Sequence, residues 1–156
     1  MLKRNWKTFA IFITIPLAAG ALSAFLSREG MEAFESLQKP SLSPPAAAFP
    51  IVWTILYILM GYSAALIWLS RDSERGNALF LWGAQLFVNF WWSIFFFRWE
   101  IRGYAFFVLL LLLGLVVWMI SAFRKIRSLA GKVNLPYLFW LCLAAWLNAG
   151  VWILNR

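Results

Sequence analysis

The chain has 156 residues, of which 63% are hydrophobic and 13% charged, and its formal net charge is +8. A soluble domain of this size needs a far more polar surface, so the composition excludes one and indicates a protein that sits in lipid. The positive charge does not indicate nucleic-acid binding, because the basic residues are scattered through short stretches between apolar segments.

Five uncharged stretches run through the sequence, at residues 8–27, 40–70, 76–97, 103–123 and 133–155. Each reaches the roughly 20 residues that a helix needs to cross about 30 Å of hydrocarbon. None shows the alternating polarity of the strands of a membrane barrel. We therefore predict an all-α membrane bundle of five transmembrane helices, at residues 6–27, 46–70, 76–98, 103–124 and 134–154. The loops are too short for an independent fold, so we expect residues 1–156 to form a single domain.

The first stretch also has features of a secretory signal, since Lys3, Arg4 and Lys7 precede an apolar run and residues 21–23 are suited to cleavage. The run is longer than the apolar part of a usual signal. We therefore favour a transmembrane helix at this position.

The connection from residue 28 to about residue 45 is the one long loop, and it contains three glutamates followed by three prolines. Phe34 and Leu37 are three residues apart, as in a short amphipathic helix lying on the bundle. The prolines restrict the chain after them to extended or turn conformations. A preordered loop of this kind suits a lid over the bundle, and an ordinary exposed connection is the alternative.

The basic residues predict the orientation in the membrane, because five spans alternate the side on which each loop lies. One side holds Lys3, Arg4, Lys7, Arg71, Arg75, Arg124, Lys125, Arg127 and Lys132, and the other holds Arg28, Lys39, Arg98, Arg102 and Arg156. The positive-inside rule then places the N-terminus in the cytoplasm and the C-terminus outside.

Tryptophan is frequent, with 11 residues, and its positions fall into two groups. Near predicted helix ends, where indole anchors at the level of the lipid headgroups, lie Trp6, Trp68, Trp82, Trp99 and Trp152. Deeper positions, or faces shared with polar residues, hold Trp53, Trp92 and Trp140. The second group supplies the better candidates for a ligand pocket.

Three stripes at helical spacing support a pocket. They comprise Trp53, Tyr57, Gly61 and Ala64 on the second helix, Gln85, Asn89, Trp92 and Phe96 on the third, and Trp140, Ala144, Asn148 and Trp152 on the fifth. Amides are costly in hydrocarbon unless they face protein or a cavity. Aromatic rings, amides and small gaps together predict a site for a flat, largely apolar ligand. Helix packing, in which small residues allow close approach and amides bond across helices, is the alternative.

The order and spacing of these motifs resemble the tryptophan-rich sensory protein family, also called TspO/MBR or translocator protein. The resemblance rests on Lys39-Pro40, Pro44-Pro45, Trp53, Tyr57, Gly61, Asn89, Trp92-Ser93, residues 95–97, residues 135–140 and Leu147-Asn148. It implies a homodimer, here of a bacterial cell membrane, that binds porphyrins and other tetrapyrroles in a cavity under the first loop. The expected ligand-binding residues are Pro44, Trp53, Tyr57, Gln85, Asn89, Trp92, Phe96, Trp140, Ala144 and Asn148.

Catalysis finds little support in the sequence. Without histidine there is no histidine-based triad or haem ligand, and the single cysteine, Cys142, allows neither an internal disulfide nor a zinc site. Family members reported to degrade porphyrin in light carry a Trp-Tyr pair at the positions of Ala33 and Phe34. We therefore expect a sensory, regulatory or trafficking receptor with tetrapyrrole as ligand and no required cofactor, metal or catalytic residue.

Two alternatives remain: an enzyme that degrades porphyrin in light or with oxygen, and a small-solute transporter. The transporter is disfavoured because no ionisable residue lies in the middle of a predicted span, where coupling sites usually occur. Sterol binding is also disfavoured, since Ala149 replaces the tyrosine of the proposed cholesterol pattern.

Overall fold

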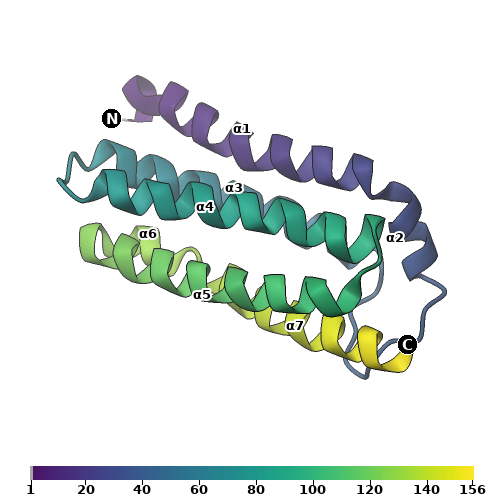
Figure 1. The fold of residues 1–156 in the computed structure, drawn as a ribbon. Helices are drawn as coiled ribbons and strands as arrows, with labels where there is room; N and C mark the ends of the chain where they lie inside the picture. The colour runs from purple at the N-terminus through teal and green to yellow at the C-terminus, as the bar shows by residue number, and fades with distance from the viewer. Residues whose placement is uncertain (1) are drawn as a thin grey trace.

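The computed structural model describes the backbone of residues 2–156 and the side chains of residues 5–156. Long helices run side by side, and short ones lie in the connections (Figure 1). The long helices are α1 (Leu2–Leu26), α3 (Ala48–Leu69), α4 (Arg75–Ser93), α5 (Arg102–Ile126) and α7 (Leu135–Leu154). The short elements are α2 (Arg28–Phe34), the π-helical turn η1 (Ile94–Arg98) that extends α4, and α6 (Ser128–Lys132).

Five helical segments of the described chain are long and apolar enough to cross a membrane, which confirms the predicted all-α membrane bundle of five helices. Helix α1 packs on α3 and α4, α4 packs on α5, and α5 packs on α7. The start of α1, the α3–α4 connection and α6 lie at one end, whereas α2, the following loop and the C-terminus lie at the other (Figure 1). We call this second end the loop end.

The close packing of α1 on α3 depends on Gly61. A Cβ at this position would collide with the backbone of Phe12 and Ile13 on α1. The stripe on the second helix indicated a gap below Tyr57 at Gly61 and Ala64. The structure corrects this, because the backbone of α1 fills the space at Gly61 and Ala64 is fully buried in the core. The lack of a side chain at Gly61 therefore allows α1 to pack closely on α3 and opens no cavity.

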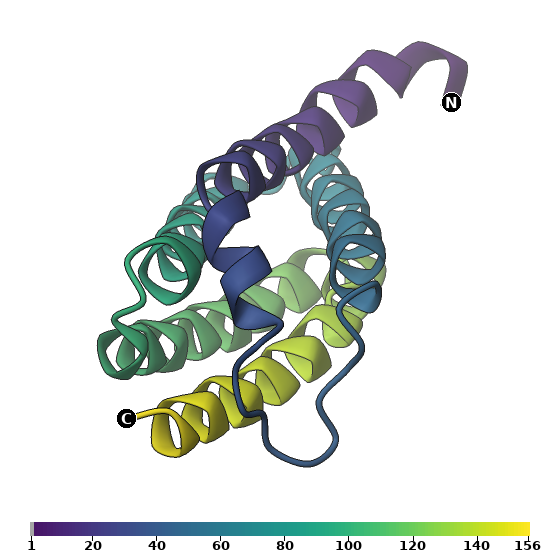
Figure 2. The same ribbon diagram turned by 90° about the vertical axis from the view of Figure 1, so that its right-hand side faces the viewer.

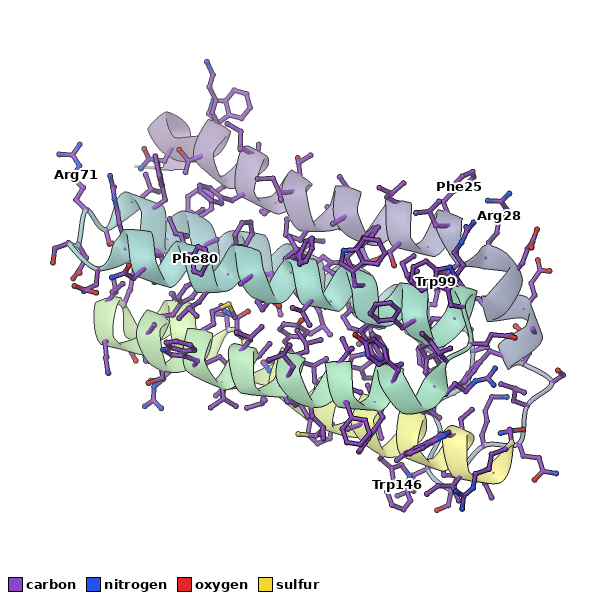
Figure 3. All side chains as sticks on the ribbon, in the orientation of Figure 1. Phe25, Arg28, Arg71, Phe80, Trp99 and Trp146 are labelled. Atoms are coloured by element: carbon purple, nitrogen blue, oxygen red, sulfur yellow. The ribbon has the colours of Figure 1, made fainter. Side chains whose placement is uncertain are left out.

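The tryptophans near helix ends do not all behave as predicted. Trp6, Trp68 and Trp99 are about half exposed, at 58%, 45% and 51%, as expected for anchors at the membrane surface. Figure 3 shows Trp99 at the loop end of the bundle. Trp82, in contrast, is buried and donates through Nε1 to the carbonyl oxygen of Met60 at 3.2 Å, so it joins α4 to α3 instead of anchoring in headgroups.

Helix α2 lies against the π-helical turn. Gly30 permits this contact, because a Cβ there would overlap the carbonyl group of Phe97. The helix ends at Phe34 and continues as a turn in which the amide of Leu37 donates to the carbonyl of Phe34. The short amphipathic helix expected in the loop therefore exists, but Leu37 lies beyond it.

The loop between α2 and α3 is fastened to α7, which it crosses in Figure 2. The side-chain amide of Asn155 bonds both backbone groups of Gln38, accepting from its N–H at 3.0 Å and donating to its carbonyl at 2.7 Å. Trp146 donates through Nε1 to the carbonyl of Ser41 at 2.8 Å. The loop thus lies over the bundle in an ordered conformation.

Replacing Gly61 with alanine tests the α1–α3 contact. We expect the variant to lose about 1–3 kcal/mol of stability, because the added methyl overpacks a backbone contact. Gly114→Ala is the matched control, since a Cβ at Gly114 meets nothing within 4 Å and alanine favours a helix. Thermal unfolding in detergent measures both variants, and an equal or higher midpoint for Gly61→Ala would contradict the contact.

Candidate ligand-binding site

A cavity of about 220 Å³ lies inside the bundle near the loop end. Five elements and the adjoining turns enclose it. Its wall consists of Gly20, Ser23 and Ala24 from α1, Met31, Phe34 and Glu35 from α2 and its end, Ala46, Phe49, Pro50, Trp53 and Tyr57 from α3 and its start, and Asn89, Trp92, Ser93 and Phe97 from α4 and η1. Most of this wall is apolar, and Glu35 is its one charged residue.

A second, much smaller niche of about 10 Å³ lies beside the cavity and has space for about one water. The two spaces share the rings of Phe49, Trp53, Trp92 and Phe97. Only the niche reaches α7, through Trp140, Leu143, Ala144 and Leu147. A shift of the shared rings would therefore join the cavity to the face of α7.

The ring of Trp53 lies at the centre of an aromatic cluster. It stacks on Tyr57 with centroids 5.5 Å apart and an interplanar angle of 27°, and it meets Trp92 at 6.3 Å. Trp140 stands edge-on to it at 6.5 Å and 89°. Trp92 in turn stacks on Phe96 at 5.7 Å and 25°. Aromatic rings therefore make up much of the wall of the two spaces, which favours a planar ligand.

Asn89 connects the cavity wall to a buried polar network. Its Nδ2 donates to the hydroxyl of Tyr137 at 2.7 Å, and that hydroxyl donates to Oε1 of Gln85 at 2.7 Å. Both bonds are buried and join α4 to α7. This bond uses one of the two N–H groups of Asn89, and the amide still has a second N–H and its oxygen available for hydrogen bonds.

Asn148 holds Trp92 from behind the wall. Nε1 of Trp92 donates to Oδ1 of Asn148 at 3.0 Å, and Nδ2 of Asn148 donates to the carbonyl of Arg102 at 2.9 Å. The indole nitrogen of Trp92 is thus occupied, and its ring is fixed as a surface. This arrangement also satisfies a buried amide that would otherwise be costly in hydrocarbon.

Trp140 differs from the other indoles, because its Nε1 is buried and has no hydrogen-bond partner among the described residues. Its ring borders the niche next to Ala144 and stands edge-on to Phe49 at 5.7 Å. An unpaired buried N–H carries a desolvation cost of about 1–3 kcal/mol. A ligand that reached the niche with an acceptor atom would remove this cost.

Comparison with known proteins identifies the family. The family model described as "TspO/MBR family" matches residues 12–153 of this chain. The chain belongs to the TspO/MBR family. It is 36% identical to Protein CrtK of Rhodobacter capsulatus over 149 residues, which cover 94% of this chain and 92% of that protein.

Similar relatives occur in mammals and in other bacteria. The translocator protein of Ovis aries is 34% identical over 155 residues, covering 97% of this chain and 92% of the relative. Tryptophan-rich protein TspO of Chlorobaculum tepidum is also 34% identical, over 153 residues, covering 95% of this chain and 96% of the relative. The resemblance read from the sequence is thereby confirmed over nearly the whole chain.

The structure brings most of the predicted site residues of this TspO/MBR protein together. The cavity wall contains Trp53, Tyr57, Asn89 and Trp92, and the niche contains Pro44, Phe96, Trp140 and Ala144. Gln85 and Asn148 border neither space. Both are fully buried behind the wall. Asn148 lies one hydrogen bond away and positions Trp92, whereas Gln85 lies two hydrogen bonds away and positions Asn89 through Tyr137.

Helical spacing predicted neither the contribution of α1 nor that of Phe97 in the π-helical turn. Gly20, Ser23 and Ala24 form the α1 side of the cavity, and Phe97 lies beside Phe34 with ring centroids 5.5 Å apart. A signal existed for α1, because these three small residues follow the spacing i, i+3, i+4. Phe49 also stands four residues before Trp53 and extends the aromatic stripe toward the loop end.

Proposed function

We propose that this TspO/MBR protein is a membrane receptor that binds a tetrapyrrole between its aromatic rings, in the cavity joined to the niche. The observation that carries the proposal is the unpartnered indole N–H of Trp140 beside a wall of stacked rings. Planar apolar ligands gain from ring surfaces, and a few polar groups fix their orientation. Asn89 would accept from a pyrrole N–H, and Trp140 would donate to a polar edge of the ligand.

The charges at the mouth of the cavity favour a ligand that keeps its carboxylates outside. Nζ of Lys39 lies 4.9 Å from the ring centre of Phe34, one of the lining residues, and donates to the carbonyl of Glu35 at 3.0 Å. A propionate emerging from the cavity would meet this ammonium group. Glu35 stands close by with the opposite charge. Each carboxylate of the ligand would be attracted by Lys39 and repelled by Glu35, so the number of carboxylates should affect the affinity of the ligand.

The size of the cavity sets a condition on binding. Its volume of about 220 Å³ is below the roughly 300–1,000 Å³ of typical small-molecule sites. A tetrapyrrole therefore requires the rings shared with the niche to move apart and α2 with its loop to shift outward. In this proposal the loop acts as a lid whose opening is part of ligand entry.

Porphyrin titration of the purified protein tests binding. We expect saturable quenching of tryptophan fluorescence, because several indoles border the proposed site. Trp53→Phe should weaken binding through lost ring area, Asn89→Leu through a lost polar contact, and Ala144→Phe by overfilling the niche. Losses of about tenfold correspond to about 1.4 kcal/mol each.

Matched controls separate the site from general damage. Trp118→Phe changes an indole that is 63% exposed, and Ala21→Phe adds a ring on the exposed face of α1. Neither should alter porphyrin affinity. The proposal fails if the three site variants bind as the parent does, or if the controls lose as much affinity as they do.

Illumination distinguishes a receptor from a porphyrin-degrading enzyme. Ala33 is exposed and Phe34 has no phenol, so the chain lacks the indole and hydroxyl that the proposed light chemistry uses at these positions. We expect the Soret band of bound porphyrin to fade no faster than in protein-free detergent. Rapid protein-dependent fading would favour the enzyme, and Ala33→Trp with Phe34→Tyr then tests whether the missing pair can confer such activity.

Cysteine labelling tests the orientation, which we propose to be N-terminus inside in a bacterial cell membrane. In a Cys142→Ser background, cysteine at Ser36 should react with an impermeant thiol reagent in intact cells, and cysteine at Ser128 should be protected. Both serines are exposed at opposite ends of the bundle. The reverse pattern would refute the positive-inside assignment.

The family resemblance also leads us to propose a homodimer. Light scattering of the protein in detergent would reveal the dimer by its mass.

A further inference from the structure

A hollow of about 320 Å³ opens at the loop end, where α5 begins and α7 ends. We call it the arginine hollow. It lies apart from the aromatic cavity, and its lining includes Arg102, Arg156, Tyr104, Trp152 and Asn155 together with the acidic residue Glu100. Among the side chains of the lining, two guanidinium groups outnumber one carboxylate, and this excess of positive side-chain charge favours an anion.

Arg102 is incompletely paired. Its Nε is buried and has no hydrogen-bond partner among the described residues, and its side chain is only 16% exposed. Nη2 of Arg102 lies 3.6 Å from Oε1 of Glu100, beyond hydrogen-bond distance, and the Glu100 side chain is 49% exposed. A partly buried guanidinium with an unsatisfied N–H calls for a further acceptor. Phosphate oxygens match the forked geometry of such a group.

The position along α5 identifies the source of the phosphate. Arg102 begins the apolar span that continues to Ile126, so the hollow lies where hydrocarbon meets the headgroup layer. Tyr104 is 59% exposed, and Trp152 borders the same hollow. Aromatic side chains at this depth pack beside lipid. We propose that the arginine hollow binds the phosphodiester headgroup of a phospholipid, with Arg102 as the main phosphate contact and Arg156 as a second.

Short-chain lipids in detergent provide the test, with native mass spectrometry as the readout. Dihexanoyl phosphatidylglycerol should bind the intact protein saturably, whereas dihexanoylglycerol, which lacks the phosphate, should bind much more weakly. Arg102→Gln should weaken phospholipid binding about tenfold, the loss expected for a charge-assisted hydrogen bond. Arg156→Gln should cause a smaller loss. Glu100→Gln should act in the opposite sense and tighten binding, because it removes the competing carboxylate.

Arg71→Gln is the matched control, since Arg71 projects from the opposite end of the bundle (Figure 3). It should leave the affinity unchanged. Equal binding of dihexanoylglycerol would overturn the proposal, as would unchanged affinity in both Arg102→Gln and Arg156→Gln. Binding of inorganic phosphate as tight as that of the phospholipid would also overturn it, by assigning the hollow to a free anion. If Arg102→Gln fails to fold, the other two variants still test the proposal. Arg156→Gln should weaken phospholipid binding and Glu100→Gln should tighten it.

Discussion

The pairing of buried amides across the bundle is the constraint on which the site depends. In hydrocarbon an amide without a partner costs several kcal/mol, so Gln85, Asn89 and Asn148 must find partners within the protein. The Tyr137 hydroxyl pairs with the amide oxygen of Gln85 and the amide nitrogen of Asn89. Asn148 pairs with the indole N–H of Trp92 and the carbonyl of Arg102. The bonds of Tyr137 and Trp92 connect α4 to α7 through side chains. They fix the two helices at a separation that aromatic rings, rather than backbone contacts, occupy.

The same bonds explain why the candidate site has a defined surface. Trp92 is held by Asn148, which in turn is bonded to the carbonyl of Arg102 at the start of α5. Trp53 has no such tether, but it lies between Tyr57, Trp92 and Trp140. A hydrogen bond thus fixes Trp92, and packing alone fixes Trp53. A ligand that enters must displace rings held by packing before it disturbs any hydrogen bond.

Much of the fold and part of the site could be predicted from the sequence, since both follow from local spacing. Apolar length predicted the five spans, and helical spacing of four and three residues put Trp53 with Tyr57 and Asn89 near Trp92. Spacing gives the face of a helix but not what covers it. Gln85 lies behind Tyr137, and α1 fills the space at Gly61, because each is covered by a different helix. Trp82 was misplaced for the same reason, since its partner Met60 is on α3.

Two kinds of contact of different strength hold α2 and the following loop to the bundle, and the difference bears on how the site could open. Asn155 and Trp146 bond the backbone of the loop to α7. Phe34 and Met31 close the cavity by packing alone, with Phe34 between Phe49, Phe96 and Phe97. In lipid or detergent, apolar contacts between rings are readily replaced by contacts with a ligand or with acyl chains, whereas backbone bonds are not. Of the two attachments, the ring packing of Phe34 is therefore the one that a ligand replaces at the lower cost.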